Sequence, residues 1–295
     1  MTDDACRLTL FMLTVKAPAK INWSLFVLDK REDGYHNIFS LLHCIGLYDI
    51  LEFELSDALT LESDMDIPCE RNLVYKAASL LKNYSGTGKG ARIILRKEIP
   101  SGAGLGGGSS DAAYTLMALN NFWELDLGKD ELKALGTHLG SDVPFFFDGP
   151  LAAAEGRGEK LTSLPVAKSY VLLLVKADCS VSTAWAYGAL DREGKMAFEK
   201  IENKKNNIQL ICRALASGDI YSIAGNAHND FENAVIRHYP VIGTVKQQLL
   251  KNGAVMALMS GSGSTVFGLF NDENGALKAS GNFQSFFCRV VKTLT

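Results

Sequence analysis

Apolar residues recur along this chain of 295 residues with the two periods that distinguish strands from helices. Short, nearly continuous apolar runs predict strands at 38–55, 91–98, 169–177 and 287–293. Residues 8–28 predict two strands around a turn or bulge, because Pro18 cannot donate a hydrogen bond to a sheet. Residues 254–259 and 266–270 predict a hairpin around a glycine- and serine-rich turn.

Helices are predicted where apolar residues recur every three or four positions. This spacing occurs at 72–82, 129–139, 182–190, 207–216, 229–238, 240–251 and 273–285. Residues 140–150 are predicted to form a loop and residues 161–169 a connector. Strands and helices both contribute, so we expect an α+β protein.

A glycine-rich segment follows the predicted strand that Pro100 ends. Glycine fills five of the seven positions from 102 to 108, and residues with helical spacing come next. Ser109 and Ser110 are good N-cap residues, and Asp111 suits a first helical turn. Glycines let the backbone approach a ligand closely, and a helix N-terminus carries partial positive charge. The segment therefore predicts a binding site for phosphate.

Several known glycine-loop patterns compete for this segment. The Walker A pattern requires Gly-Lys-Ser/Thr, but Ser109 follows Gly108 directly. The Rossmann pattern is matched literally by three glycines, yet the following helix runs into another predicted helix rather than a parallel strand. The signatures of protein kinases are absent. A tight glycine turn without any ligand stays open as the structural alternative.

Composition and charge narrow the class of protein. Hydrophobic residues make up 47% and charged residues 21%, which excludes intrinsic disorder. A net charge of −3 does not suit a whole-domain basic surface for nucleic acid. No 18-residue run is free of charge and glycine, and the N-terminus lacks a secretory signal, so we expect a cytoplasmic protein without a membrane span. The six cysteines and five histidines show no metal-binding spacing.

Three segments resemble, in order, the motifs of the GHMP kinase superfamily, which includes galactokinase and the homoserine and mevalonate kinases. They are VKAPAKINWSL at 15–25, PSGAGLGGGSSDAA at 100–113 and MSGSGSTVFGLF at 259–270. Further segments are DGYHNI at 33–38, GSDVPFF at 140–146 and EGRGE at 155–159. These resemble the branch that phosphorylates the 2-hydroxyl of a cytidine-diphosphate-linked methylerythritol in the non-mevalonate isoprenoid pathway.

The resemblance implies the α+β GHMP kinase fold, with an active site in the cleft between two domains. We expect the glycine loop in a domain at 1–165 and the third motif in a domain at 166–295. It also implies ATP and Mg²⁺ as cofactors and a small-molecule substrate. From charge and composition we expect no nucleic acid or membrane partner. A monomer and a homodimer both remain open.

For the transfer itself, the resemblance implies Lys20 and Asp142 as the catalytic pair, with Asn22 beside the acceptor. Lys20 would neutralise charge on the transferring phosphoryl group, and Asp142 would accept the proton of the hydroxyl. Tyr35 and His36 match the residues that hold the cytidine, and Tyr187 matches an aromatic ring that stacks on cytosine.

For ATP, the resemblance implies an adenine pocket at Asn72 and Leu73. The predicted phosphate loop consists of Pro100, Gly102, Gly104, Leu105, Gly106, Gly107, Gly108, Ser109 and Ser110. Ser110 is also the candidate ligand for Mg²⁺, an interpretation that competes with plain N-capping. The third-motif loop of Gly261, Ser262, Gly263 and Ser264 is expected to support the substrate side of the cleft.

Each of these residues also has an ordinary structural interpretation. Lys20 alone suggests a surface lysine, Asp142 a helix N-cap, Tyr35 and His36 a turn, and Tyr187 helix packing. Asn229 and Asp230 suggest a helix cap rather than a site. At the level of function, another kinase of the superfamily and a ligand-binding relative without catalysis are the alternatives. The DGYH segment and Tyr187 favour the cytidine-linked substrate over homoserine or mevalonate, which carry no cytidine.

Overall fold

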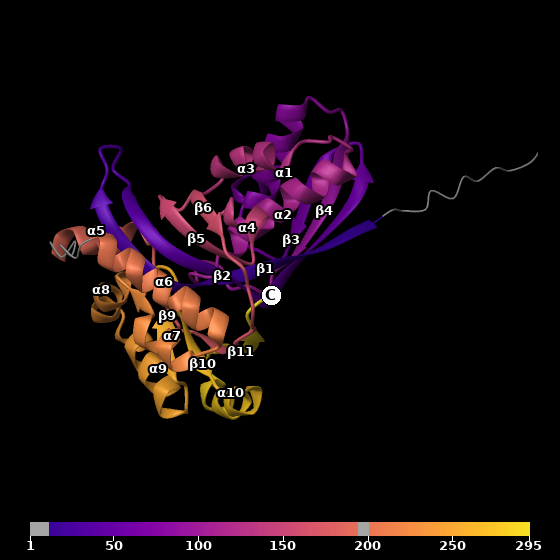
Figure 1. Ribbon diagram of the computed structural model, residues 1–295. Helices are drawn as coiled ribbons and strands as arrows, with labels where there is room; N and C mark the ends of the chain where they lie inside the picture. The colour runs from indigo at the N-terminus through magenta and orange to yellow at the C-terminus, as the bar shows by residue number, and fades with distance from the viewer. Residues whose placement is uncertain (1–11, 194–200) are drawn as a thin grey trace, which may run out of the picture.

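The computed structural model describes residues 12–193 and 201–295 and folds them into two β-sheets with helices packed against each (Figure 1). The first sheet has the strand order β3-β4-β2-β1-β8, with β5 paired to β2 and β6 paired to β5. Its strands are β1 (Met12–Lys30), β2 (His36–Ser56), β3 (Leu59–Ser63), β4 (Gly90–Arg96), β5 (Leu151–Gly156), β6 (Lys160–Ser163) and β8 (His228–Asn229).

Strand β1 is continuous, so the prediction of two strands in this region is wrong. The proline is accommodated by a shift in the pairing register with β2 between Pro18 and Ala19, which is the predicted bulge. Residues 8–11 of the predicted segment lie outside the described residues. Side chains alternate along the strand, so Ile21 and Trp23 are fully buried while Lys20 and Asn22 face a cleft.

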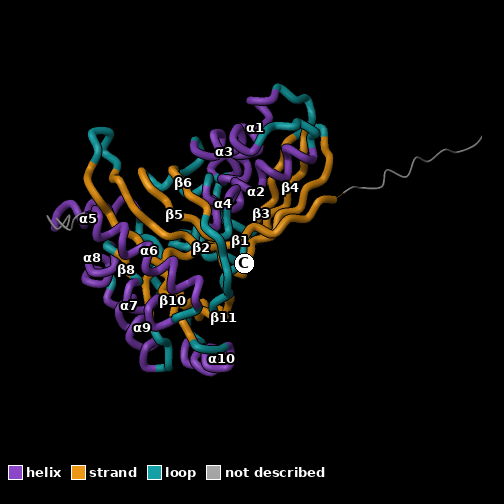
Figure 2. Tube along the Cα trace, viewed as in Figure 1, coloured by secondary structure: helices purple, strands orange, loops and turns teal. Residues whose placement is uncertain are grey.

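Helices of the first half gather beside this sheet, as the tube in Figure 2 shows. They are η1 (Cys69–Arg71), α1 (Leu73–Ser85), α2 (Gly107–Phe122), α3 (Lys129–Thr137) and α4 (Phe145–Asp148). Buried side chains of β2, β4, α1 and α2, such as Phe53, Leu81 and Leu116, form one apolar core. Burial of side chains of this size is the main term that holds the helices on the sheet.

The second half contains a four-stranded sheet in the order β11-β7-β10-β9. Its strands are β7 (Val171–Lys176), β9 (Met256–Met259), β10 (Thr265–Phe270) and β11 (Phe287–Lys292). The helices are α5 (Thr183–Glu193), α6 (Ile201–Ser217), α7 (Ile220–Asn226), α8 (Phe231–His238), α9 (Pro240–Lys251), α10 (Glu273–Ser280) and η2 (Gly281–Phe283). Strands β9 and β10 pair antiparallel, which confirms the predicted hairpin.

The two sheets share an apolar core. Trp23 of β1 packs edge-on against Phe267 of β10, with ring centroids 5.6 Å apart, and against Tyr170, which immediately precedes β7. A cluster of buried side chains from both sheets surrounds this contact. The expected boundary at residues 165/166 falls between β6 and β7. The division into two domains stays a prediction.

The sequence pattern does not predict several short elements. Strands β3, β5, β6 and β8 and helix α7 have no counterpart among the predicted elements. Helix α4 occupies part of the segment predicted as a loop at 140–150. Helix α2 begins at Gly107 with Gly106 as its N-cap, so Ser109 and Ser110 lie inside the helix and the N-cap prediction for them is wrong. Within the described residues, no helix is both long and apolar enough to cross a bilayer.

Candidate active site

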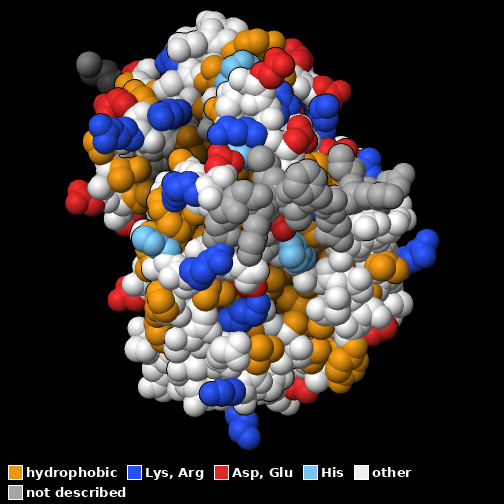
Figure 3. Space-filling model, turned by 90° about the vertical axis from the view of Figure 1, so that its left-hand side faces the viewer, with side chains coloured by type: hydrophobic (Ala, Val, Ile, Leu, Met, Phe, Trp, Pro, Cys, Tyr) orange, Lys and Arg blue, Asp and Glu red, His pale blue; other side chains and the backbone are white. Residues whose placement is uncertain are grey.

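A cleft of about 830 Å³ lies between the glycine loop, the start of β2 and α5. Most of the predicted site residues line it: Lys20, Asn22, Tyr35, His36, Leu73, Pro100, Gly102, Gly104, Gly106, Gly107, Gly108, Ser109, Asp142, Tyr187, Gly261 and Ser262. The face of the molecule in Figure 3 carries Lys, Arg, Asp and Glu side chains intermixed.

Lys20 lies at the floor of this cleft. Its residue is only 4% exposed, so the interpretation as a surface lysine is wrong. Its Nζ donates a hydrogen bond to Oδ1 of Asn22 at 2.8 Å and lies 3.6 Å from Oδ2 of Asp142. Asp142 is partly exposed and does not cap α4, whose N-cap is Pro144. The structure thus brings the predicted catalytic pair together, with the carboxylate on the open side.

The glycine loop closes directly over the side chain of Lys20. The backbone N–H of Lys20 donates to the carbonyl of Leu105 at 2.9 Å. Gly106 has φ +70°, and a Cβ at this position would lie 2.9 Å from Cγ of Lys20. Both the backbone conformation and the close approach require glycine here. The sequence of the loop therefore sets the position of the lysine as well as the space for phosphate.

The same loop touches the third-motif loop from the other sheet. Oγ of Ser260 donates to the carbonyl of Gly104 at 2.9 Å, and the N–H of Thr265 donates to the carbonyl of Ala103 at 3.2 Å. A Cβ on Gly104 would lie 2.0 Å from the carbonyl oxygen of Ser260. The two loops are packed backbone to backbone, so a displacement of one would disrupt these contacts with the other.

Ser110 lies in the first turns of α2, next to Ser109 of the cleft wall. It is fully buried, and its Oγ has no hydrogen-bond partner among the described residues. No group of three or more His, Cys, Asp or Glu side chains in the described part of the chain is arranged to hold a metal. A hydroxyl oxygen suits Mg²⁺, which usually takes its other ligands from substrate phosphates and water. The residues present thus fit a magnesium ion held mainly by a bound nucleotide.

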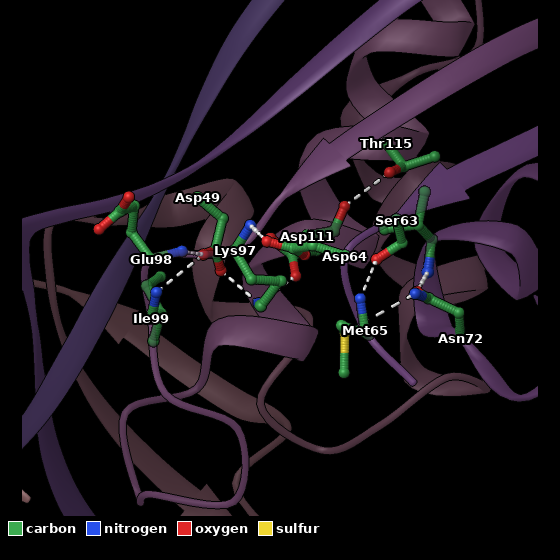
Figure 4. A network of polar contacts seen from close by, with 11 residues as sticks. Asp49, Ser63, Asp64, Met65, Asn72, Lys97, Glu98, Ile99, Asp111 and Thr115 are labelled. Atoms are coloured by element: carbon green, nitrogen blue, oxygen red, sulfur yellow. Dashed lines mark hydrogen bonds and ion pairs between the residues drawn. The ribbon is translucent and has the colours of Figure 1, made fainter. Parts of the chain in front are cut away.

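Behind the glycine loop, Lys97 is clamped by two buried carboxylates, a network that the sequence analysis did not identify (Figure 4). Its Nζ donates to Asp49 of β2 and, at 2.6 Å, to Asp111 of α2. Asp49 also accepts from the backbone N–H groups of Glu98 and Ile99, at 2.7 and 2.8 Å. The network therefore ties β2, the start of the loop and α2 together.

Burial and charge act against each other in this network. Burial raises the pKa of Asp111 to about 7, although the nearby Lys97 ammonium lowers it. Burial lowers the pKa of Lys97, but the two carboxylates more than compensate, so that the pKa lies above its ordinary value. Lys97 lines the cleft. With both carboxylates bound to it, Lys97 is better suited to holding the loop than to binding phosphate.

At the opposite end of the cleft, His36 stacks on Tyr187, with ring centroids 4.9 Å apart and an angle of 14° between the planes. The Nε2 of His36 lies 2.7 Å from Oδ1 of Asp191, and Oδ2 of Asp191 accepts from Lys30 at 2.6 Å. The hydrogen bond from Lys30 and, to a smaller extent, the one with His36 lower the pKa of Asp191 below its ordinary value. No sequence pattern points to Asp191, which lies 155 positions from His36.

Tyr35 completes this end from the turn between β1 and β2. It is 55% exposed, and the guanidinium of Arg157 lies 4.9 Å from its ring centroid. Tyr187 lines the same cleft and is partly buried, which raises the pKa of its hydroxyl to about 12. One exposed and one partly buried aromatic ring, together with an imidazole, line this end of the cleft, and such rings can stack on a planar base.

Five predicted site residues do not line the cleft: Asn72, Leu105, Ser110, Gly263 and Ser264. They lie in its supporting wall. Oδ1 of Asn72 caps α1 by accepting from the N–H of Val74 at 3.0 Å. Oγ of Ser264 donates to the carbonyl of Cys179 at 2.8 Å. Their assigned binding roles stay predictions.

Family models match both halves of this chain, and curated relatives match nearly all of it. The family description "GHMP kinases N terminal domain" matches residues 72–150, and "GHMP kinases C terminal" matches residues 210–287. The chain is 51% identical to the 4-diphosphocytidyl-2-C-methyl-D-erythritol kinase of Thermodesulfovibrio yellowstonii, over 96% of this chain and 98% of the relative. It is 40% identical to the same kinase of Caldicellulosiruptor bescii, over 96% and 98%.

Solved structures are also similar to this chain. The chain resembles a crystal structure of 4-(cytidine 5'-diphospho)-2C-methyl-D-erythritol kinase with a TM-score of 0.81 and 34% identity, over 96% of this chain and 100% of that one. Homoserine kinase from Cytophaga hutchinsonii matches with a TM-score of 0.74 and 20% identity, over 96% and 95%. The second likeness concerns the fold alone.

Proposed function

Because this chain belongs to the 4-diphosphocytidyl-2-C-methyl-D-erythritol kinase family of the GHMP kinases, we propose that its cleft transfers the γ-phosphoryl group of ATP to the 2-hydroxyl of 4-diphosphocytidyl-2-C-methyl-D-erythritol. One observation carries the proposal: buried Lys20 and partly exposed Asp142 lie 3.6 Å apart, between a phosphate loop and an aromatic pocket. The motifs of the sequence predict the same family.

In this proposal the glycine loop and the N-terminal turn of α2 bind the phosphates of ATP. The backbone N–H groups of such a loop, together with the positive end of the helix, attract anionic oxygens. Leu73 at the start of α1 lies in the cleft wall and would contact the adenine. Ser110, whose hydroxyl has no other partner among the described residues, would help to hold Mg²⁺, and the ion would supply neutralisation of the nucleotide's negative charge.

Lys20 would act on the transferring group. Its position below the loop, fixed by Asn22, brings a cation to the place where negative charge spreads over the γ-phosphoryl oxygens. A preorganised charge in a water-poor site stabilises such a transition state more than it would in water. Phosphoryl transfer depends mainly on this positioning and charge stabilisation.

Asp142 would orient the acceptor. The 2-hydroxyl oxygen forms its bond to the γ-phosphorus while the bond from phosphorus to the β,γ-bridging oxygen breaks, and ADP leaves. The hydroxyl proton passes to a carboxylate oxygen of Asp142. A free aspartate, with a pKa of about 3.9, is a weak base, so orientation of the hydroxyl is the larger part of its contribution.

The aromatic pocket would hold the cytidine end of the substrate. Tyr35 and Tyr187 offer ring faces for the base, and the His36 ring offers a polar edge fixed by Asp191. Homoserine and mevalonate carry no planar group for this pocket. Action in the cytoplasm, and the choice between monomer and homodimer, stay expectations of the proposal.

The test is ADP release with ATP and Mg²⁺ against three acceptors: 4-diphosphocytidyl-2-C-methyl-D-erythritol, mevalonate and homoserine. We expect turnover with the first alone. Asp142→Asn should lower kcat by about 10²- to 10⁴-fold, the range of general acid–base catalysis, while ATP still binds. Asp130→Asn, an exposed position on α3, is the matched control. Turnover with mevalonate or homoserine instead would reject the cytidine pocket.

A further inference from the structure

We propose that Asn229 and Glu232 are positioning residues that hold the third-motif loop against Lys20, in the kinase reaction proposed above. Both belong to the junction of β8 and α8, where the sequence suggested no more than a helix cap. The N-cap of α8 is Asp230, and the side-chain amide N–H groups of Asn229 are directed to the loop. The segment thus caps α8, as the sequence suggests, and also binds the third-motif loop.

Asn229 is 5% exposed and uses both ends of its side-chain amide. Its Nδ2 donates to the carbonyl of Met259 at 2.7 Å and to the carbonyl of Gly261 at 2.8 Å. Its Oδ1 accepts from the backbone N–H of Phe231 at 3.0 Å. An amide that donates both of its hydrogens to two carbonyls of one loop fixes the distance between those carbonyls.

Glu232 binds the backbone N–H of Met259, the residue whose carbonyl accepts from Asn229. Its Oε1 accepts from the backbone N–H of Met259 at 3.0 Å, and its Oε2 pairs with Lys246 of α9. The N–H and the carbonyl of Met259 are thus bound by two side chains three positions apart. Met259 is fully buried, so without these side chains its backbone groups would lose partners in a place that water does not reach.

The loop that they hold faces the reacting groups. Gly261 lines the cleft, and a Cβ at this position would lie 3.5 Å from Nζ of Lys20 and 3.2 Å from the carbonyl oxygen of Gly104. Next to it, Ser260 donates to that same carbonyl. A displacement of the loop therefore changes the space around the lysine and the phosphate loop together.

The segment is anchored to the strand that carries Lys20. Strand β8 pairs with β1 at Ser24 and Leu25, and the N–H of Asp230 donates to the carbonyl of Leu25 at 3.0 Å. The carboxylate of Asp230 accepts from the N–H of Val27 at 2.7 Å. Asn229, Asp230 and Glu232 thus join β1 to the third-motif loop. We infer that they set the distance between Lys20 and Gly261.

The test compares variants that separate the backbone contact from the ion pair. Glu232→Ala removes both, Lys246→Met removes only the ion pair, and Glu232→Gln retains an oxygen that can accept from Met259. Asn229→Asp keeps the shape but places a carboxylate oxygen where an N–H group faced two carbonyls. Kinetics are measured as ADP release, with kcat and both KM values determined separately.

We expect Glu232→Ala and Asn229→Asp to lower kcat by about 10- to 100-fold, with a smaller change in either KM, as for loss of a hydrogen bond that involves a charged group. Glu232→Gln and Lys246→Met should stay within about threefold of the unmodified enzyme, since each retains an acceptor for the Met259 N–H. If Lys246→Met loses as much activity as Glu232→Ala, the ion pair is what matters and the proposal is overturned.

Hydrogen exchange makes the test independent of turnover. Amides of 257–265 should exchange faster in Glu232→Ala than in Lys246→Met, and Glu232→Gln should restore slow exchange. Equal exchange in all three variants would contradict the positioning role. This result would hold even if the unmodified enzyme proves to phosphorylate a different substrate. If Asn229→Asp does not fold, the three variants at Glu232 and Lys246 still decide the question.

Discussion

Lys20 donates from Nζ to Oδ1 of Asn22 at 2.8 Å, closer than the 3.6 Å that separates it from Asp142. Asn22 in turn donates from Nδ2 to Oγ of Ser40, which donates to the carbonyl of Ser24 at 2.7 Å. The lysine is therefore held by a chain of hydrogen bonds between β1 and β2. Asp142 remains able to bind an acceptor hydroxyl.

Replacement of Asn22 by Ala should release Lys20 from this arrangement. We expect kcat to fall by about 10- to 100-fold, the effect of losing a hydrogen bond to a charged group, with little change in the KM for ATP. Steady-state ADP release measures both constants. Ser40→Ala leaves the bond between Lys20 and Asn22 in place and should have a smaller effect. An unchanged kcat in Asn22→Ala would show that Lys20 keeps its position without this partner.

Replacement of Lys97 by Met should destabilise the protein and weaken ATP binding. Two buried carboxylates would lose their counter-charge, a change that typically costs about 3–5 kcal/mol of the free energy of unfolding. The KM for ATP should rise, because Asp49 would no longer be held where it binds the start of the loop. Denaturant unfolding and ADP release measure the two effects.

The control for Lys97 is Lys129→Met. Lys129 is an exposed lysine of α3 whose partner, Asp148, retains a second ion pair with Lys133. Exposed ion pairs contribute at most about 1 kcal/mol, so this variant should stay close to the unmodified protein in stability and in KM for ATP. Equal losses in the two variants would mean that burial of the Lys97 network adds nothing.

Replacement of Asp191 by Ala should affect the acceptor and spare ATP. The His36 ring would lose the partner that fixes its orientation against Tyr187. We expect the KM for the cytidine-linked acceptor to rise by about 3- to 10-fold, the range for one ordinary hydrogen bond, with the KM for ATP unchanged. Lys30→Met is the control, since it keeps the bond between Asp191 and His36. A rise in the KM for ATP alone would place the acceptor elsewhere.

His43 should make stability depend on pH. It is buried between Trp23, whose Nε1 donates to its Nδ1 at 3.0 Å, and the carbonyl of Leu294, which accepts from its Nε2 at 2.9 Å. Burial lowers its pKa from 6.5 to about 4. Unfolding therefore takes up a proton between these values. The contribution of His43 to stability is complete above pH 6.5 and is lost as the pH falls through this range.

The measurement is the free energy of unfolding at pH 7 and at pH 5, for the protein and for His43→Gln. The advantage of the unmodified protein over the variant should shrink by about 2 kcal/mol at the lower pH. Comparison with the variant cancels the effect of other titrating groups. His138→Gln, at an exposed position on the surface, should show no such difference. A constant difference between His43→Gln and the unmodified protein would contradict the assignment.

The parts of the site that the sequence predicts are those whose geometry is local. A run of glycines followed by helical periodicity predicts the glycine loop and α2, because both patterns depend on neighbours in the chain, although the helix begins at Gly107 rather than after Ser109 or Ser110. Gly102, Gly104 and Gly106 all have positive φ, as the loop requires. Asp33-Gly34 likewise forms the turn that brings Tyr35 and His36 to the cleft.

The parts that the sequence does not predict depend on contacts between distant residues. Lys97 pairs with Asp49 at a separation of 48 positions, and Asn229 contacts Gly261 at a separation of 32. The sequence around a lysine with charged neighbours, or around an asparagine before a helix, is the same whether the side chain is exposed to solvent or bound by buried partners. Strands as short as β6 and β8 contain too few residues to show a period.

The alternation of β1 has a consequence for how this protein can vary. From Ala19 to Asn22 the side chains alternate: Ala19 and Ile21 lie in the apolar core, and Lys20 and Asn22 line the cleft. A substitution there alters one position. Insertion or deletion of a single residue would move Lys20 to the core side and an apolar neighbour to the cleft, because the side-chain period of a strand is two. Relatives that keep the chemistry should therefore differ here in composition but not in length.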